Sequence, residues 1–380
     1  MNWEKLQNGS DIRGVALEGI EGEHVNLTPE VIETIAKSFV RWIRNTIGCQ
    51  TPKIAIGTDS RLSGATIKNA FIKGAVEAGA DIIDCSLAST PAMFMTTVND
   101  DVQATASVMV TASHLPYNRN GLKFFTPKGG LDNRDIADIL DIAERGDYAY
   151  DGAAGHLATL DFMTIYSSHI ADYICQGVHA DDYEHPLKGM HIVVDAGNGG
   201  GGFFERILSQ LGADTKGSQF LDPDGRFPNH IPNPENAEAM GPVCRAVADS
   251  DADLGVIFDT DVDRSAIIGR NGEPINRNAL IALIASVILE EHPHSTIVTD
   301  SVTSDGLADF ISRKGGRHHR YRRGYKNVIN EGIRLNEAGE ECWLAIETSG
   351  HAALRENYFL DDGAYLAAKL IVYAAKLFRE

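Results

Sequence analysis

The sequence predicts an α/β protein made of three consecutive, topologically similar domains, each with a mixed or parallel sheet. Short apolar runs of strand length alternate with longer amphipathic segments along the whole chain. With 380 residues, the chain is too long for one compact core, so two or three domains are expected. The strand–helix series restarts twice, after an acidic, glycine-rich stretch and again near Asn276. We therefore expect domains at residues 1–157, 158–272 and 273–380.

Composition excludes several classes of function. A hydrophobic content of 43% with 23% charged residues is ordinary for a soluble globular protein. The net charge of −19 argues against a nucleic-acid or anionic-membrane partner, but a phosphorylated small molecule needs only a local basic pocket. The 5 cysteines are scattered and suggest neither a disulfide framework nor a zinc site. The start of the chain lacks the apolar core of a signal peptide and no apolar run reaches membrane-spanning length, so we expect a cytoplasmic protein. We further expect a monomer or a homodimer.

The first series begins with a loop that carries Arg13 and with a helix that starts at Thr28 and Pro29. Thr28 suits the N-cap and Pro29 the first helical position, and apolar residues follow at helical spacing. Further elements are expected as strands at 53–57, 82–85 and 106–110 and a helix at about 65–78. Because these strands alternate with helices, their sheet should be parallel and covered by helices.

The strand at 106–110 leads directly into Thr111-Ala112-Ser113-His114-Leu115-Pro116. Small and hydroxylated residues end the strand, and Pro116 prevents regular structure from continuing. Ser113 and His114 should therefore lie on a turn at the carboxyl end of a strand, where ligands bind in open α/β sheets. The alternative is an ordinary polar turn without chemistry.

A glycine-rich turn marks the second series. Residues 197–202 follow a strand at 191–196 and precede a helix at 203–211, and they satisfy the G-x-G-x-x-G pattern of dinucleotide sites. Asp222 lies at the spacing of a ribose ligand but leads into a loop with four prolines. We therefore favour a tight strand-to-helix turn, and a proline-rich loop of this length is usually functional.

Asp259, Asp261 and Asp263 alternate directly after the apolar strand 254–258. In extended backbone alternate side chains share a face, so the three carboxylates should converge. Oxygen ligands alone favour Mg²⁺ before Ca²⁺ or Mn²⁺. The alternatives are a solvated acidic turn and the haloacid-dehalogenase signature, which the position of Asp263 disfavours.

The third series ends in two polar segments. Its expected elements are helices at 280–290, 306–314 and 363–378 and strands at 297–300 and 343–346. The basic stretch 317–326 is interrupted at Gly324-Tyr325 by an expected turn, and it suits either a phosphate or sugar pocket or a solvated face. In the loop Glu347-Thr348-Ser349-Gly350-His351, Glu347 and Ser349 could grip adjacent sugar hydroxyls.

Taken together, the segments 111–116, 259–264 and 347–351 resemble the three signatures of the α-D-phosphohexomutase superfamily. This superfamily includes phosphomannomutase/phosphoglucomutase and phosphoglucosamine mutase. The segments 57–64, 195–202 and 227–234 also fall in the family's order, so the resemblance covers nearly the whole chain.

The resemblance implies interconversion of hexose 6-phosphate and hexose 1-phosphate, for glucose or mannose, through a hexose 1,6-bisphosphate. Glucose 1,6-bisphosphate would be the activator, and one Mg²⁺ would bind per chain. Ser113 would carry the phosphate, and a phosphate oxygen on Ser113 would complete the metal site of Asp259, Asp261 and Asp263. The implied catalytic residues around the reacting phosphate are Arg13, His114, Lys123 and His351, and the implied substrate contacts are Arg264, Tyr325, Glu347 and Ser349. Alternatives are a phosphoglucosamine mutase, a non-catalytic sugar-phosphate-binding relative and a dehalogenase-type phosphatase.

The chain departs from the family pattern in several places. Leu115 stands where Asn is usual, and Thr260 and Ile346 stand where Gly is common. We expect the metal site to tolerate Thr260, whose side chain should point away from the carboxylates in an extended strand. Nothing after Asp361 resembles the family's fourth, phosphate-binding domain. We therefore expect either a fragment of a longer protein or a protein that has lost this phosphate grip, and slower turnover than in a chain extended to include the fourth domain.

Overall fold

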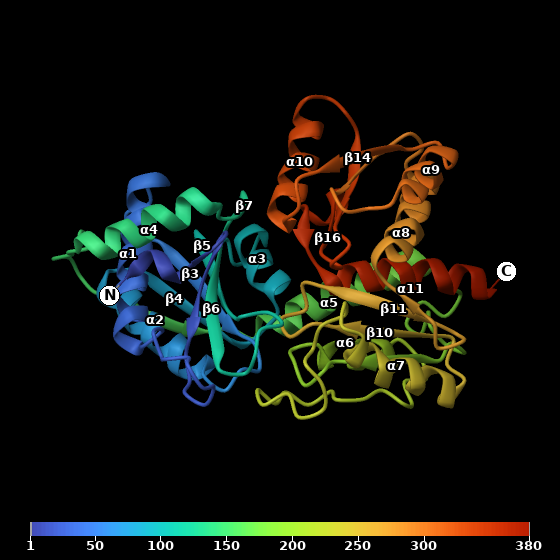
Figure 1. Ribbon diagram of the computed structural model, residues 1–380, viewed down its shortest axis with the longest axis horizontal. Coiled ribbons are helices and arrows are strands. Elements are labelled where there is room, and N and C mark those ends of the chain that lie inside the picture. The colour runs from blue at the N-terminus through green and yellow to red at the C-terminus, as the bar shows by residue number, and fades with distance from the viewer. Residues whose placement is uncertain (1, 380) are drawn as a thin grey trace. The chain divides into compact units, whose positions relative to one another are not determined.

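The computed structural model describes residues 2–379, which form two compact units. The first unit runs to Ile165 and includes Asp224–Arg226, and the second comprises Tyr166–Pro223 and the chain from Phe227 onward. The first unit contains one sheet and the second contains two, so the predicted arrangement of three α/β domains is confirmed (Figure 1). The exact bounds 1–157, 158–272 and 273–380 stay predictions.

The sheet of the first unit is mixed. Its strand order is β1-β2-β6-β5-β3-β4-β8, and β7 pairs with β6. The strands are β1 (Gln7–Asn8), β2 (Asp11–Val15), β3 (Lys53–Thr58), β4 (Asp81–Leu87), β5 (Ala106–Val110), β6 (Arg119–Thr126), β7 (Gly129–Gly130) and β8 (Leu157–Thr159). Strands β3, β4 and β5 are parallel, as predicted, and β8, which was not predicted, is parallel to β4, whereas β6 runs antiparallel to β5. The carboxyl ends of β3 and β5 therefore meet at one edge of the sheet.

Helices cover both faces of this sheet. The helices are α1 (Pro29–Thr46), α2 (Gly64–Glu77), α3 (Thr90–Val98) and α4 (Asn133–Arg145), with the short 3-10 helix η1 (Trp3–Leu6) before β1. Helix α1 packs against α2 and α4, and its Phe39 ring lies 4.6 Å from the ring of Phe124 on β6. Phe125, the next residue on β6, stacks at 5.8 Å on Phe94 of α3. Because neighbouring strand residues point to opposite faces, α3 covers the face opposite to α1.

The second unit begins with a four-stranded sheet of order β12-β11-β10-β9. Its strands are β9 (Ile192–Asp195), β10 (Leu254–Phe258), β11 (Ser265–Gly269) and β12 (Pro274–Ile275), and the nearby helices are α5 (Phe162–Val178), α6 (Gly202–Gln210) and α7 (Ala237–Ser250). Strands β10 and β11 form an antiparallel hairpin in which Phe258 pairs with Ser265. This register leaves residues 259–264 as the hairpin connection.

The other sheet of the second unit has the order β14-β13-β15-β16-β17. Its elements are β13 (Thr296–Asp300), β14 (Arg317–Tyr321), β15 (Cys342–Ile346), β16 (Ala352–Leu354), β17 (Leu360–Asp361), α8 (Arg277–Glu291), α9 (Asp305–Arg313), α10 (Tyr325–Glu337), η2 (Arg355–Asn357) and α11 (Gly363–Arg379). Helix α11 contacts α8 and β16 of this domain and also β10 and β11, so it joins the two sheets of the unit (Figure 1). Over residues 2–379, every helix is too short or too polar to cross a membrane.

Candidate active site

The connection between β10 and β11, residues 259–264, gathers three buried carboxylates, which we call the aspartate cluster. Asp259, Asp261 and Asp263 are each 0% exposed, and one carboxylate oxygen from each lies within 4.8 Å of the others. The backbone here is a turn: Val262 has φ of 67° and its N–H donates to the Asp259 carbonyl at 3.4 Å. The carboxylates thus converge because the chain turns, and the predicted extended strand with its alternating faces is wrong.

Burial and mutual repulsion define the electrostatics of the aspartate cluster. Burial, followed by the charges of Asp263 and Asp261, raises the pKa of Asp259 well above its usual range, while Arg264 opposes this shift. The Arg264 Nε donates to Asp259 Oδ2 at 2.9 Å, and His351 Nδ1 lies 3.9 Å from Asp263 Oδ2, so these two basic side chains face three buried carboxylates. Buried like charges of this kind favour a cation among them. The donor set consists of carboxylate oxygens, so the residues fit a hard divalent ion.

The glycine-rich turn at 197–202 packs against the backbone of the aspartate cluster. The Gly200 N–H donates to the Thr260 carbonyl at 2.8 Å. A Cβ on Gly199 would lie 2.8 Å from both the Cα and the carbonyl oxygen of Thr260. This close approach of two backbones requires a glycine at position 199, which favours the turn interpretation over a dinucleotide site. Thr260 itself is fully buried in this packing.

Gly199→Ala is therefore expected to displace the aspartate cluster. Its Cβ would press on the Thr260 backbone, which cannot rotate away, and overpacking of this kind costs about 2 kcal/mol. We expect Mg²⁺ affinity, measured by titration calorimetry, to fall about 30-fold, because about 2 kcal/mol of strain in the ligand loop corresponds to that factor. Gly306→Ala is the matched control, since Gly306 lies exposed in the first turn of α9 and its Cβ would meet only ordinary contacts. It should leave metal affinity unchanged and add up to about 1 kcal/mol of stability. A wild-type affinity in Gly199→Ala would show that the turn does not support the cluster.

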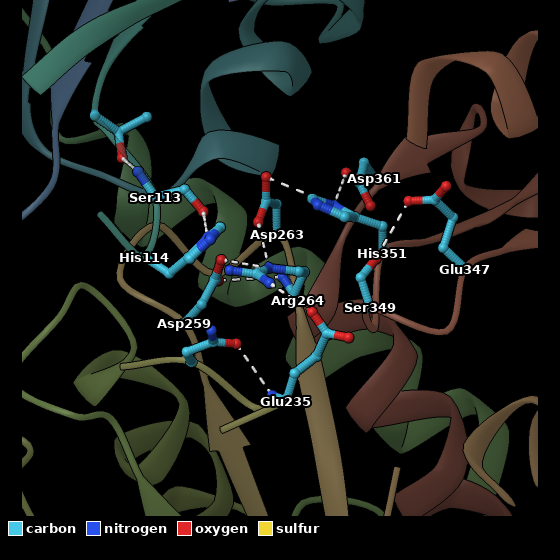
Figure 2. A network of polar contacts seen from close by, with 12 residues as sticks. Ser113, His114, Glu235, Asp259, Asp263, Arg264, Glu347, Ser349, His351 and Asp361 are labelled. Atoms are coloured by element: carbon cyan, nitrogen blue, oxygen red, sulfur yellow. Dashed lines mark hydrogen bonds and ion pairs between the residues drawn. The ribbon is translucent and has the colours of Figure 1, made fainter. Parts of the chain in front are cut away.

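A second loop, residues 347–351 between β15 and β16, brings the predicted sugar contacts together. The Ser349 hydroxyl donates to Glu347 Oε2 at 3.2 Å (Figure 2). The Gly324 N–H donates to Glu347 Oε1 at 2.6 Å. The Tyr325 ring stacks on the His351 ring with centroids 4.8 Å apart. Gly324, with φ of 120°, lies in the bend between β14 and α10, so the chain turns there as predicted, and Tyr325 is the first residue of α10. Glu347, Ser349, His351 and Tyr325 thus form one neighbourhood.

This loop is held by an aspartate that the sequence interpretation missed. The Thr348 hydroxyl donates to Asp300 Oδ2 at 2.7 Å, and Asp300 is fully buried at the end of β13. Strands β13 and β15 are parallel neighbours, so their carboxyl ends lie together. The only sequence signal for this contact is the polar residue at the end of an apolar strand.

His351 joins the loop at 347–351 to the aspartate cluster. Its Nδ1 lies 2.6 Å from Asp361 Oδ2 and 3.9 Å from Asp263 Oδ2, so the ring stands between two carboxylates (Figure 2). An isolated β-bridge pairs Arg264 with His351 and connects the two loops. Burial alone would lower the pKa of His351, but Asp361 and then Asp263 raise it to about 9. Asp361 was not predicted as a site residue, although it lies close to His351 in sequence.

Ser113 lies in the first unit, directly after β5. It is buried and adopts the left-handed conformation, with φ of 51°. Its N–H donates to Thr111 Oγ1 at 2.9 Å, and its Oγ lies 3.3 Å from His114 Nδ1 (Figure 2). The structure therefore has Ser113 and His114 on a turn at the carboxyl end of a strand, as the sequence predicted.

Arg13 and Lys123 lie on the same face of this sheet. Arg13 on β2 pairs with Gly121 on β6, and Lys123 follows Gly121 by two residues. Paired and alternate strand residues share a face, so both basic side chains start from one face near the β5 end. Gly121 has to be glycine, because a Cβ would collide with the Ile12 carbonyl and approach Arg13 Cγ to 3.0 Å. Arg13 also donates to Asp11 Oδ2 at 2.9 Å.

Part of the basic stretch at 317–326 is paired with carboxylates of the second unit. Arg317, His319 and Arg320 lie 3.6, 3.0 and 2.7 Å from carboxylates of Glu340, Glu331 and Asp305, respectively. Residues 317–321 form strand β14. These ion pairs favour the solvated-face interpretation for this part of the stretch over a phosphate or sugar pocket.

His318, within this stretch, makes stability depend on pH. Burial, followed by the charges of Arg320 and His319, lowers its pKa to about 4, while its Nε2 lies 2.7 Å from the Thr299 hydroxyl. A histidine that stays neutral when folded contributes stability above pH 6.5 that is lost as the pH falls toward 4. We expect His318→Gln to reduce the stability lost between pH 7 and pH 5 by about 1 kcal/mol, a value discounted for solvent screening. Urea unfolding at both pH values measures this, with His294→Gln, at an exposed histidine, as the control. An unchanged pH dependence in His318→Gln would contradict the prediction.

Comparison with known proteins identifies the class. Three family models, described as phosphoglucomutase/phosphomannomutase alpha/beta/alpha domains I, II and III, match residues 4–149, 166–272 and 276–378. The chain therefore belongs to the phosphoglucomutase/phosphomannomutase family, and the predicted phosphohexomutase superfamily is confirmed.

Individual relatives agree with this assignment. The phosphomannomutase/phosphoglucomutase of Pseudomonas aeruginosa is 30% identical over 346 residues, which cover 89% of this chain and 70% of that protein. The phosphoglucomutase/phosphomannomutase of Thermococcus kodakarensis is 31% identical over 378 residues, covering 98% of this chain and 77% of that protein. The crystal structure of a phosphoglucomutase/phosphomannomutase family protein from Burkholderia thailandensis has a TM-score of 0.80 at 26% identity, covering 98% of this chain and 77% of that one.

Proposed function

We propose that this chain interconverts the 6-phosphate and 1-phosphate of glucose or mannose, with Ser113 as the phosphate carrier and hexose 1,6-bisphosphate as the intermediate. The observation that carries the proposal is the convergence, in the second unit, of the aspartate cluster with His351, Glu347 and Ser349. The names of the relatives, phosphomannomutase/phosphoglucomutase and phosphoglucomutase, support the same reaction.

Asp259, Asp261 and Asp263 would hold one Mg²⁺, which when bound neutralises charge on phosphoryl oxygens. The Arg264 Nε donates a hydrogen bond to the Asp259 carboxylate and so keeps that carboxylate oriented. Because the aspartate cluster is fully buried, its carboxylates make few hydrogen bonds to water that would weaken their hold on a cation.

The proposed reaction moves phosphate between Ser113 and a sugar hydroxyl. The bond from phosphorus to Ser113 Oγ breaks, a bond from phosphorus to the sugar oxygen forms, and the hydroxyl proton leaves to a nearby base. A pKa of about 9 keeps His351 protonated at neutral pH, so His351 is proposed to donate its Nε2 proton to the sugar oxygen when the phosphate returns to Ser113, while Asp361 holds its Nδ1. In the opposite direction the same Nε2, once it has lost that proton, takes up the proton of the sugar hydroxyl. Lys123 is the second proposed proton-transfer group, and Arg13 and His114 are proposed to assist at the phosphate. The bisphosphate then returns its other phosphate to Ser113.

Substrate binding is assigned to the residues around His351. Glu347 and Ser349 present a carboxylate and a hydroxyl 3.2 Å apart, a spacing that suits neighbouring sugar hydroxyls. Tyr325, stacked on His351, offers an aromatic surface at the same place, and Arg264 is the proposed contact for the reacting phosphate.

Turnover of glucose 1-phosphate tests the proposal. The purified chain is incubated with Mg²⁺, glucose 1-phosphate and catalytic glucose 1,6-bisphosphate as the activator, and glucose 6-phosphate is measured, with EDTA as the control. Mannose 1-phosphate and glucosamine 1-phosphate in parallel assays decide the sugar. Release of inorganic phosphate in place of an isomer, or no isomer from any of the three sugars, would refute the proposed reaction.

A further inference from the structure

Arg61 is a buried arginine beneath the loop that carries Ser113. It follows β3 in the first unit and is 3% exposed. Its Nη2 donates to the carbonyls of Ser113 and Leu115, the latter at 2.7 Å. Its Nη1 donates to the carbonyls of Pro116 and Arg119 at 2.8 and 3.0 Å. One guanidinium therefore binds four main-chain carbonyls of residues 113–119.

These four bonds use nearly the whole donor capacity of the side chain. A guanidinium has five N–H donors in one plane, and the Arg61 Nε faces Asp59 Oδ2 at 3.4 Å. A lysine ammonium has three donors on a single nitrogen and cannot span carbonyls spread over this loop. Residues 113–118 lie outside any strand or helix, so most of these carbonyls depend on partners other than a regular main-chain ladder, although the Pro116 carbonyl also accepts the Arg119 N–H at 3.0 Å and Arg119 begins β6. The pattern is specific for arginine.

Asp59 ties Arg61 to the backbone of Ser113 by a second route. Its Oδ1 accepts the Arg61 N–H at 2.9 Å, and its Oδ2 accepts the Thr111 hydroxyl at 2.6 Å. The Thr111 Oγ1 in turn accepts the Ser113 N–H at 2.9 Å. The Ser113 peptide is thus held at its carbonyl by Arg61 and at its amide by Thr111.

This double anchor explains the backbone conformation of Ser113. A φ of 51° is uncommon for a residue with a Cβ and persists only where the surroundings enforce it. The chain continues from Ser113 into Leu115 and Pro116, whose carbonyls Arg61 also binds. Without the guanidinium, the loop would lose its support on the buried side.

We propose that Arg61 is a positioning residue that holds the Ser113 loop in the conformation required for phosphate transfer. The proposal rests on the proposed function, because it assumes that Ser113 carries the phosphate. Arg61 acts through main-chain carbonyls and not on the reacting atoms. Small errors in the placement of a reacting group cost about 100-fold in rate, which sets the scale of the expected effect.

Arg61→Lys tests the proposal in the full chain. We expect kcat with glucose 1-phosphate to fall about 100-fold while KM changes less than threefold, since the sugar contacts are unaffected. Amide hydrogen exchange of residues 113–119 should become at least about tenfold faster, with exchange in α1 unchanged. Arg44→Lys is the matched control. Arg44 lies in the same unit and also donates to two carbonyls, those of Gln50 and Ala78, but neither carbonyl belongs to the Ser113 loop. It should leave kcat and loop exchange within twofold of the wild type.

Further readouts keep the test decisive. If circular dichroism shows that Arg61→Lys is unfolded, Arg61→Gln, a neutral side chain with two donors, takes its place with the same expectations. Loop exchange and kcat within twofold of the wild type would overturn the proposal, as would an equal loss of kcat in Arg44→Lys. A wild-type chain without mutase turnover would refute the proposed function, and with it the catalytic part of this proposal. Loop exchange would then still report whether Arg61 holds the loop.

Discussion

Ser113→Ala is expected to lower kcat by about 10,000-fold or more and to abolish the phosphate adduct that we expect on the wild-type protein. The reason is that a covalent carrier has no substitute: without Oγ, phosphate has no protein atom to which it can transfer. The backbone around position 113 should survive, because its anchors bind the main-chain N–H and carbonyl. Intact-mass spectrometry of freshly purified protein and the glucose 1-phosphate assay measure the two effects.

Ser312→Ala serves as the control for Ser113→Ala, because Ser312 is exposed on α9 in the second unit. It should keep both the phosphate adduct and the wild-type kcat. An adduct that persists in Ser113→Ala, and that peptide mapping assigns to Ser63 or Ser349, would show that another serine carries the phosphate.

The strands that lead into the site were predictable because they are almost fully buried. Strands β5 and β10 have the predicted bounds, and β15 begins one residue earlier than predicted. A strand covered on both faces is a continuous apolar run, and the polar residues at its carboxyl end mark the sheet edge. The end of each apolar run therefore indicated from the sequence that Ser113, Asp259 and Glu347 lie at the carboxyl ends of strands.

Elements whose pattern is interrupted were not predictable in this way. Strand β6 contains Lys123, a buried charge, and begins with Arg119 and Asn120, so its sequence has no apolar run at the start. Helix α7 contains Pro242, which normally ends a helix. In both cases tertiary packing outweighs local preference.

The residues that hold the site in place act across long sequence separations. Arg61 binds carbonyls more than fifty residues away, and Asp300 binds Thr348 from another strand. Such partners have no local pattern, because strand order in the sheet and not sequence spacing makes them neighbours. The aspartate cluster shows the converse: its spacing revealed the residues, but the turn at Val262 that gathers them became visible only in the fold.

Asp261→Asn is expected to weaken Mg²⁺ binding about 100-fold, to lower turnover to a similar extent and to leave the metal-free protein at least as stable as the wild type. The loss of Mg²⁺ affinity and the unchanged or higher stability without metal have the same cause, the repulsion among the three carboxylates. The three carboxylates are buried together, and the repulsion of Asp261 contributes to the raised pKa of Asp259. Replacing one carboxylate by an isosteric amide relieves that repulsion when no cation is bound and removes a charged ligand when one is.

Urea unfolding with and without Mg²⁺ separates the two effects of Asp261→Asn. At a Mg²⁺ concentration 100 times the wild-type Kd, the wild type should gain about 2.7 kcal/mol, whereas a variant with a 100-fold weaker Kd gains only about 0.4 kcal/mol. Thr260→Ala is the matched control, because the Thr260 carbonyl that accepts the Gly200 N–H stays in place. Its gain from Mg²⁺ should match the wild type, even if its metal-free stability falls through lost packing. Equal loss of the Mg²⁺ gain in both variants would mean that the turn geometry, and not the Asp261 carboxylate, determines binding. A wild type that gains nothing from Mg²⁺ would remove the metal from the proposed mechanism, because a ligand that binds only the folded state has to stabilise it.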